Sequence, residues 1–112
     1  MDINDIKNLC NLGVYRWTEH IIDRMAKRHI SRDDVKQALM SGEIIEDYPE
    51  DYPEDYPEDY PYPSCLIYNQ VNNNPLHVVC GIGNNELWLI TAYYPDLTEW
   101  HDDYRTRKEQ VQ

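Results

Sequence analysis

The sequence predicts an α+β domain in which N-terminal helices pack on one face of a four-stranded, mainly antiparallel sheet. Apolar residues recur at helical spacing up to residue 41. After Gly42 they come in short runs rich in Ile, Val and Tyr, with Asn, Gly and Pro between the runs, as is typical of strands and turns. A length of 112 residues suits one domain over residues 1–112.

Three helices are expected before the strands, and a capping or terminating residue marks at least one terminus of each. The first, over residues 2–12, ends at Gly13. The second follows Thr18, whose hydroxyl can cap the first helical turn. The third begins at Ser31, which opens a capping-box pattern, and ends at Gly42.

Four strands are expected over residues 43–48, 64–71, 76–82 and 86–94. Short turns rich in Asn and Gly separate the last three and favour antiparallel pairing of neighbours. The helices would then cover one face of the sheet and leave the other face more open for a functional site. The polar residues 96–112 are expected to hold a short helix around Trp100 and a frayed tail.

An acidic tandem repeat, four copies of EDYP, occupies residues 46–61. Proline at every fourth residue is incompatible with a regular helix or a central strand, so residues 46–63 are expected to be a loop insertion between the first two strands. The net charge is −11, but the copies hold eight carboxylates and no base, which leaves 10 basic against 13 acidic residues elsewhere. This near-neutral remainder does not exclude a nucleic-acid substrate, although it argues against a broad basic binding face.

Two interpretations of the repeat stay open. The simpler one is a neutral expansion at a tolerant site, because doubling the length of a loop costs only about 0.6 kcal/mol. In the other, the acidic, Tyr-rich loop competes with nucleic acid for the functional site as an internal mimic.

The cysteine pattern and the absence of apolar spans predict a cytoplasmic protein without membrane contact. Cys10, Cys65 and Cys80 are odd in number and widely spaced, which argues against a disulfide framework and favours small buried hydrophobes. No apolar run reaches the roughly 20 residues of a membrane span, and the first residues show no signal-peptide pattern. Phosphate-cradle motifs are missing, and the four His have no ligands at metal-site spacing, so neither a cofactor nor a metal is expected.

A His/Arg stripe is the first candidate for chemistry. His20, Arg24 and Arg28 follow one another at four-residue spacing and so share one side of the second helix. A His can give or take a proton near neutral pH, and two Arg can clamp phosphate oxygens. The alternative interpretation is a solvated helix face, which spacing alone favours.

A second His on a strand shifts that balance. Alternation puts Leu76, Val78 and Cys80 on one face of the third strand and His77 on the other. Two His from different elements, with Arg nearby, form an acid/base and electrophile set. Packing of His77 in the interior is the competing interpretation. The nearby aromatic residues could stack on bases, or they could pack in the core; they are Tyr93, Tyr94 and Trp100.

Three stretches carry a family pattern: WTEHIIDRMAKRHISRDDVKQALMSGEIIEDYP, PLHVVCGI and LWLITAYYPDLTEW. Over roughly residues 15–100 they resemble the DUF4258 family of small bacterial and archaeal proteins. Two features depart from the pattern, since His29 replaces the usual Gly after the second Arg, and the single EDYP is multiplied to four copies.

The resemblance implies kinship with RelE/MqsR-type toxins, which are small ribonucleases often paired with an antitoxin that carries a zinc-binding domain. A RelE-like fold would follow. The recurrent polar positions of the family fall on His20, Arg24, Arg28, His77, Thr91, Tyr93 and Trp100.

We therefore expect the toxin of a toxin–antitoxin pair, acting as a metal-independent endoribonuclease on RNA. His77 would take the proton of the attacking 2′-hydroxyl, and His20 would protonate the leaving oxygen. Arg24 and Arg28 would stabilise the transition state, Tyr93 would orient the substrate, and two further residues, Thr91 and Trp100, would bind it. The expected partner is a cognate antitoxin with a CxxC zinc-binding domain.

Two rival functions remain. One is a non-enzymatic binding or regulatory module that uses the acidic loop to bind a basic partner. The other is a toxin attenuated by its EDYP repeat. The sequence leaves the RNA specificity and the formation of a homo-oligomer open.

Overall fold

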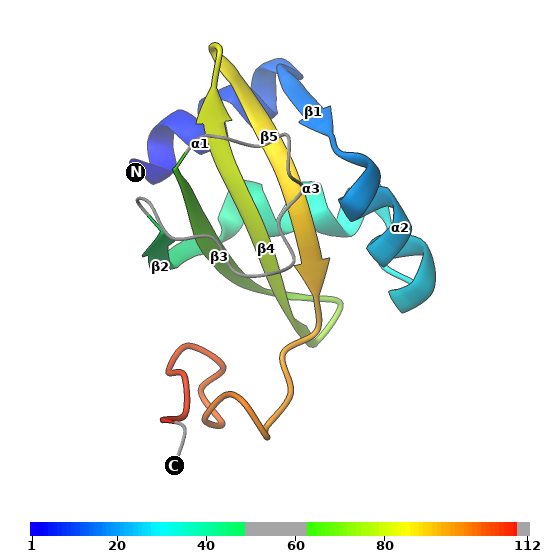
Figure 1. Ribbon diagram of the computed structural model, residues 1–112, viewed down its shortest axis with the longest axis vertical. Helices are drawn as coiled ribbons and strands as arrows, with labels where there is room; N and C mark the ends of the chain where they lie inside the picture. Colours follow the sequence, from blue (N-terminus) through cyan, green and yellow to red (C-terminus); the bar gives the residue numbers. More distant parts are fainter. Residues whose placement is uncertain (49–62, 110–112) are drawn as a thin grey trace.

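The computed structural model describes residues 1–48 and 63–109, which form helices and one mixed sheet. The helices are α1 (Ile3–Leu12), α2 (Glu19–Arg28) and α3 (Arg32–Ser41). The strands are β1 (Tyr15–Trp17), β2 (Glu43–Tyr48), β3 (Ser64–Val71), β4 (Asn74–Gly83) and β5 (Glu86–Tyr93). They lie in the order β1-β5-β4-β3-β2 (Figure 1). The predicted α+β class is confirmed.

The prediction of a four-stranded, mainly antiparallel sheet is wrong at one edge, where β1 adds a fifth strand. Tyr15 to Trp17 pair in parallel with residues 87–89 of β5, whereas the other three pairings are antiparallel. Three residues are too few to show an alternating pattern, and their partner strand lies at the far end of the sequence. Local periodicity therefore could not reveal β1.

Side-chain caps set the helix starts as predicted. The Thr18 Oγ1 accepts a hydrogen bond from the Ile21 amide at the start of α2. Ser31 and Asp34 form the reciprocal capping box of α3. The short helix expected around Trp100 is absent from the described residues; Trp100 instead forms an isolated bridge with Arg107 in an irregular segment.

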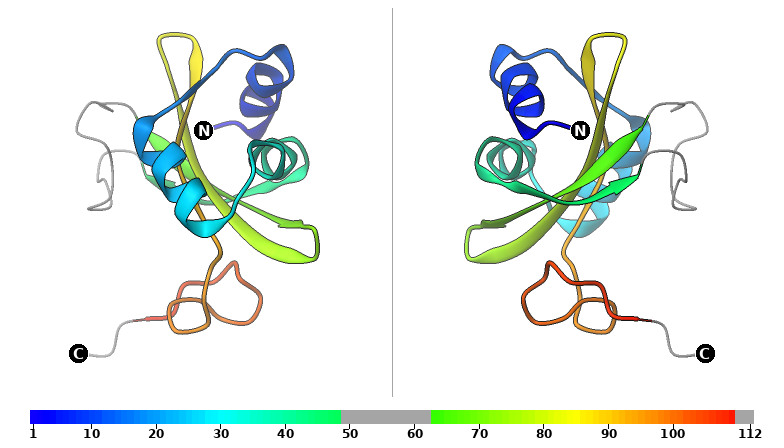
Figure 2. Two further views of the ribbon diagram at one scale, coloured as in Figure 1. Left: turned by 90° about the vertical axis from the view of Figure 1, so that its right-hand side faces the viewer. Right: turned by 90° about the vertical axis from the view of Figure 1, so that its left-hand side faces the viewer.

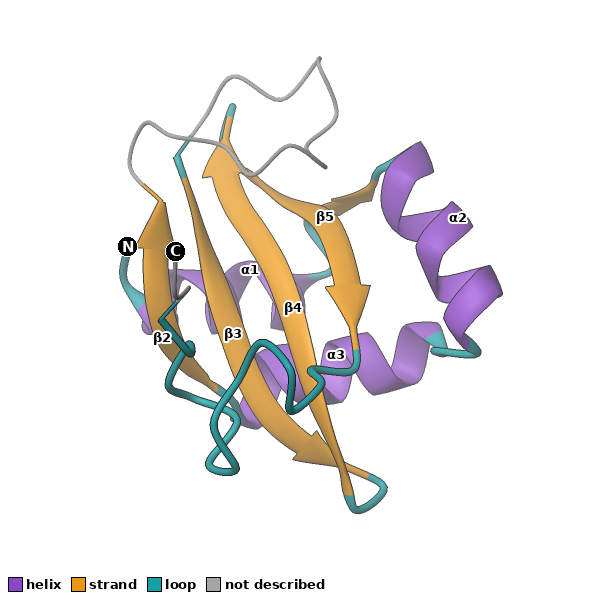
Figure 3. Ribbon diagram, turned by 60° about the horizontal axis from the view of Figure 1, so that its bottom comes forward, coloured by secondary structure: helices purple, strands orange, loops and turns teal. Residues whose placement is uncertain are grey.

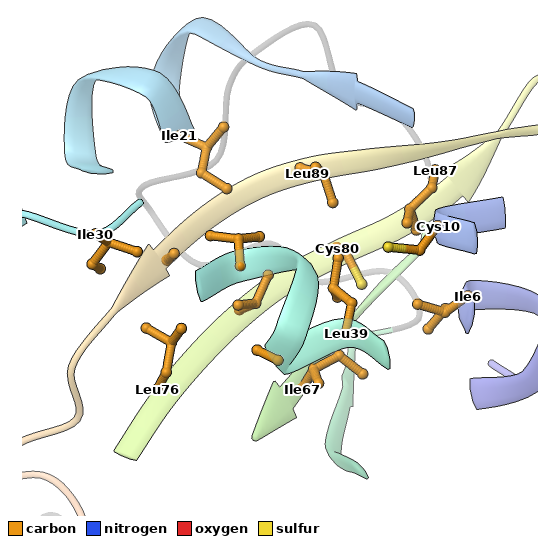
Figure 4. Close-up of a cluster of buried hydrophobic side chains, with 14 of the residues drawn as sticks. Ile6, Cys10, Ile21, Ile30, Leu39, Ile67, Leu76, Cys80, Leu87 and Leu89 are labelled. Carbon is orange, nitrogen blue, oxygen red and sulfur yellow. The ribbon is translucent and has the colours of Figure 1, made fainter. Parts of the chain in front are cut away.

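Helices cover one face of the sheet. Figure 2 shows α1 and α3 side by side on that face, and Figure 3 shows the segment after β5 crossing the opposite face. The helix-side core joins side chains from all three helices to those of β3, β4 and β5 (Figure 4). Cys10, Cys65 and Cys80 lie in it as free, buried thiols, as predicted. Within the described ranges no helix is long and apolar enough to cross a bilayer.

A second, smaller core forms on the opposite face. It comprises Leu66, Val79, Trp88, Ile90 and Trp100. The alternation predicted for β4 is confirmed, since Leu76 and Val78 pack in the helix-side core while Val79 packs here. Burial on both faces explains why β3, β4 and β5 read as nearly continuous apolar runs.

The first EDYP copy begins inside β2. Glu46, Asp47 and Tyr48 pair with β3, so the predicted boundary of the first strand at residue 48 is confirmed. The predicted loop 46–63 therefore starts with three strand residues. Its positions 49–62 lie outside the described residues.

Gly42 lies at the end of α3, in close contact with β3. A Cβ at this position would overlap the Ala38 carbonyl oxygen and lie 2.8 Å from both the Ile67 Cγ2 and the Tyr68 carbonyl oxygen. Two of these three atoms are backbone and cannot move aside. We therefore expect Gly42→Ala to lower the free energy of unfolding by about 1–3 kcal/mol, measured by urea denaturation. Gly13→Ala is the contrasting variant, because its penalty comes from a φ of 74° in open space rather than from overlap.

Candidate functional site

A cleft of about 500 Å³ opens between α2, the end of β5 and the segment that follows β5. Its lining combines polar and apolar surface and carries both signs of charge. The polar side chains are Arg28, Tyr48, Thr91, Tyr93, Tyr94, Asp96, Glu99 and Arg107. A concave site with a few convergent polar groups is the usual form of a ligand site.

A β-bulge in β5 turns two of these side chains into the cleft. The register between β4 and β5 shifts at Ile90, which has no partner across the pair. Strict alternation from Trp88 would have turned Thr91 and Tyr93 toward the helices and Ala92 toward the cleft. With the extra residue the phase reverses: Ala92 packs in the helix-side core, and Thr91 and Tyr93 line the cleft.

Arg28 forms the wall contributed by α2. It lies in the last turn of the helix, half-buried, and its Nη1 donates to the carbonyl oxygen of Ala92 at 2.7 Å. That bond fixes the guanidinium against the end of β5. A guanidinium has five N–H donors, and this one makes no ion pair within the described part of the chain, so donors remain for a ligand in the cleft.

Arg107 forms the part of the wall contributed by the segment after β5. Its Nε and Nη2 donate to the two carboxylate oxygens of Glu46 at 3.2 and 3.0 Å, and the Tyr48 hydroxyl donates to the same carboxylate. The guanidinium lies over the Trp100 ring, 4.6 Å from its centroid. The bond to Glu46 raises the pKa of Arg107 above its ordinary value. The first EDYP copy thus holds this wall to β2.

Tight local bonds shape the segment that carries Arg107. Asp103 accepts from the hydroxyl and amide of Thr106 and from the amide of Arg105, and these bonds lower its pKa to about 2. Lys108 donates to the carbonyl oxygen of Leu97. The segment is therefore an ordered cap on this face of the sheet.

Tyr93 lies at the floor of the cleft. Its hydroxyl is 3.2 Å from Nδ1 of His77. Burial raises its pKa above the ordinary value, while the positive charges of Arg107 and Arg28 partly offset that shift. Tyr93 is therefore a neutral phenol at physiological pH.

His77 lies behind Tyr93 with no exposed surface. Its Nε2 is 2.7 Å from the carbonyl oxygen of Tyr104, and the Trp100 ring packs edge-on at 4.5 Å between centroids. Burial lowers its pKa to about 4, although the Tyr104 carbonyl and the Glu46 carboxylate act in the opposite direction. The imidazole is neutral at physiological pH, and both ring nitrogens are engaged.

This burial predicts a loss of stability in mild acid. Below the ordinary pKa of 6.5 an unfolded His77 takes up a proton, whereas the folded residue resists protonation down to about pH 4. The free energy of unfolding should therefore fall from pH 6.5 toward pH 4, with about 2 kcal/mol lost by pH 5. Urea denaturation at pH 7 and pH 5 measures the difference. His77→Phe should remove most of it, and an equal fall in both proteins would contradict this account of His77.

The structure brings together only part of the predicted set. Arg28, Thr91 and Tyr93 line one cleft, and the buried His77 contacts it through Tyr93. The other three lie outside the lining. Their positions are the half-buried His20 in the first turn of α2, Arg24 in an ion pair with Asp23 at 2.7 Å, and Trp100 in the core with 1% of its surface exposed.

Sequence reasoning missed several residues of the lining. Tyr48, Asp96, Glu99 and Arg107 belong to segments that it treated as a repeat loop and a polar tail. The one feature of the sequence that could have indicated the pair was charge, because Arg107 lies in a basic tail and Glu46 at the acidic end of a strand. No group of three or more metal-binding side chains occurs in the two described ranges.

Comparison with known proteins identifies a family. The family model described as "Domain of unknown function (DUF4258)" matches residues 17–94, from the end of β1 to just past β5. No curated protein and no solved structure matches the chain. The match includes Arg28, Thr91, Tyr93 and His77, whereas Arg107 lies beyond it. The chain is a member of the DUF4258 family.

Proposed function

We propose that the chain is a metal-independent endoribonuclease, the toxin of a toxin–antitoxin pair, and that the cleft binds RNA. One observation carries the proposal: two guanidinium groups from separate elements, Arg28 and Arg107, meet the hydroxyls of Thr91 and Tyr93 in a single cleft. Guanidinium groups bind phosphate oxygens bidentately, and hydroxyls suit ribose and phosphate alike.

The proposed reaction needs no metal. The ribose 2′-oxygen attacks the adjacent phosphorus, the bond to the 5′-oxygen breaks, and a 2′,3′-cyclic phosphate and a 5′-hydroxyl form. Arg28 stabilises the negative charge that develops on the phosphoryl oxygens. The carboxylate of Glu99, one of two acidic side chains in the lining, takes the 2′-hydroxyl proton as the 2′-oxygen attacks, and water at the open side of the cleft supplies the proton for the 5′-oxygen.

The two imidazoles have different places in this proposal from those expected from the sequence. His77 cannot reach a phosphodiester directly, because it has no exposed surface and both of its ring nitrogens already form hydrogen bonds, one with the Tyr93 hydroxyl and one with the Tyr104 carbonyl oxygen. It acts by holding Tyr93. His20 lies outside the lining, so a direct role for it would require a substrate that extends along α2.

The cellular setting is proposed on the same basis. A cognate antitoxin would bind this cytoplasmic toxin and cover the cleft, and its CxxC zinc-binding domain follows from the resemblance to RelE/MqsR-type pairs. Co-expression of the adjacent reading frame with the chain should relieve growth arrest if the pair exists.

RNA cleavage by the purified protein tests the activity. A 5′-labelled single-stranded RNA, incubated with excess EDTA, should yield fragments that end in a 2′,3′-cyclic phosphate, and DNA of the same sequence should stay intact. Induced expression should arrest growth. Intact RNA, both with and without ribosomes, together with normal growth would reject the nuclease.

A non-enzymatic binding module is the second candidate, and the charge balance of the cleft favours it. Asp96 and Glu99 line the cleft, and Glu46 already neutralises Arg107. A basic peptide would find acceptors there. Saturable binding of an Arg/Lys-rich peptide by a chain that cleaves no RNA, lost in an Asp96→Asn/Glu99→Gln double variant, would support this alternative.

A further inference from the structure

A chain of hydrogen bonds runs from the floor of the cleft into the cap. It starts at the Tyr93 hydroxyl, passes through Nδ1 and Nε2 of His77 at 3.2 and 2.7 Å, and ends at the carbonyl oxygen of Tyr104. Tyr93 belongs to the cleft lining, while His77 is fully buried. The direction of the hydrogen bonds in this chain determines whether the Tyr93 hydroxyl can donate to a ligand in the cleft or only accept from it.

The backbone carbonyl fixes that direction. A carbonyl oxygen only accepts, so Nε2 of His77 must carry a hydrogen and donate it to Tyr104. A neutral imidazole has one N–H, so Nδ1 must accept, and the Tyr93 hydroxyl must donate to it. Burial keeps the ring singly protonated by lowering its pKa to about 4, although Glu46 raises that pKa and Arg107 lowers it further.

Packing prevents the ring from turning over. His77 lies among edge-on aromatic neighbours, with centroids of Tyr68, Tyr93 and Trp100 at 5.7, 5.2 and 4.5 Å. A flipped imidazole would place carbon atoms opposite the Tyr104 carbonyl and the Tyr93 hydroxyl and lose both hydrogen bonds. The hydrogen of the Tyr93 hydroxyl therefore points away from the cleft.

We infer that Tyr93 offers the cleft only hydrogen-bond acceptors and thereby selects the 2′-hydroxyl of a ribonucleotide over the bare 2′-carbon of a deoxyribonucleotide. An ionised phosphate oxygen has no hydrogen to donate, so it binds the guanidinium of Arg28 and not the phenol. In the bound substrate the ribose hydroxyl donates to the phenol oxygen beside it, and its hydrogen passes to Glu99 only as the 2′-oxygen attacks. Tyr93 is then a specificity-determining residue, and His77 is the positioning residue behind it. The inference rests on the proposed function, because it assigns the ribose to the same cleft.

Two nucleotides that the protein cannot cleave provide the test. Adenosine 3′-monophosphate and its 2′-deoxy counterpart differ only in the group that Tyr93 is inferred to read. Titration of the ¹⁵N-labelled protein with each, followed by NMR, gives the two dissociation constants. The native chain should bind the ribonucleotide about 2–10-fold more tightly, the range that one neutral hydrogen bond supports.

Tyr93→Phe should weaken binding of the ribonucleotide alone and bring the ratio of the two dissociation constants to about one. His77→Phe keeps a ring in place, removes the acceptor for the Tyr93 hydroxyl and should also lower the ratio. Tyr15→Phe is the matched control. It makes the same chemical change on a half-buried tyrosine of β1 that lies outside the cleft lining, and the ratio should persist.

A purely structural role for Tyr93 predicts a different result, in which Tyr93→Phe weakens both nucleotides equally. That result, or a ratio of one in the native chain, overturns the inference. Failure to bind either nucleotide overturns it as well. The RNA cleavage assay is separate: cleavage without ribose discrimination rejects only the role of Tyr93, whereas discrimination without cleavage rejects only the nuclease.

Discussion

Replacing Arg28 with Ala is expected to lower the rate of RNA cleavage by about 10²–10³-fold while the fold stays intact. Arg28 is the guanidinium of the lining that no carboxylate in the described residues neutralises, and its bond to the Ala92 carbonyl holds it beside Tyr93. In the proposed reaction, the guanidinium of Arg28 is already positioned to donate hydrogen bonds to the phosphoryl oxygens as negative charge develops on them. The measurement is single-turnover cleavage of a labelled RNA at saturating protein.

Arg24 provides the matched control for this prediction. It lies one turn earlier on α2 and carries the same charge, but it pairs with Asp23 and lies outside the cleft lining. Arg24→Ala should therefore change the rate by much less than Arg28→Ala. Arg28→Lys should recover only part of the rate, because an ammonium keeps the charge without the bidentate geometry. Equal losses for Arg24→Ala and Arg28→Ala would place the chemistry on the helix face and not in the cleft.

The fold was predictable where local rules decide it. Caps at Thr18 and Ser31 and apolar spacing set the helices, and alternation placed the side chains of β4. The edge strand β1 was not predictable, because it consists of three residues whose pairing partner is distant in sequence. It joins the sheet through its pairing with β5.

The site was predictable only in part, for a related reason. The spacing of α2 and the family pattern pointed to Arg28 and Tyr93, but alternation alone would have turned Tyr93 away from the cleft. The bulge at Ile90 reverses the alternation of side chains along β5 after this residue, and no residue type in the sequence predicts such a bulge. The pairing of Glu46 with Arg107 joins positions far apart in sequence, so only the packed structure brings their charges together.

The first copy of the EDYP repeat has a structural role, which is to hold the cap against β2. Glu46 and Tyr48 are not loop residues: they belong to β2, and their carboxylate and hydroxyl anchor the cap through Arg107. Within the described residues, the first copy supplies this anchor.

Replacing Trp100 with Ala is expected to lower the free energy of unfolding by about 3–5 kcal/mol, the range for truncating a buried aromatic ring. Trp100 is 1% exposed, packs edge-on against His77 and lies under the guanidinium of Arg107. Its loss would leave a void between the sheet and the cap. Urea denaturation measures the change. Leu97→Ala in the same cap removes a half-exposed side chain and should cost less than about 0.5 kcal/mol.

Two effects of Trp100→Ala at the cleft, on the pKa of His77 and on the wall that carries Arg107, distinguish the role of the Trp100 ring in the cap from a general loss of packing. Water that enters the void would reach His77, so its pKa should rise from about 4 toward its ordinary value of 6.5 in Trp100→Ala, as followed by NMR titration of the imidazole. Arg28 and Thr91 are placed by α2 and β5, so their wall should persist while the wall that carries Arg107 loosens. An unchanged His77 pKa in a folded Trp100→Ala protein would mean that the cap seals the imidazole without its tryptophan. In that case the Glu46–Arg107 pair, and not the ring, holds the cap closed.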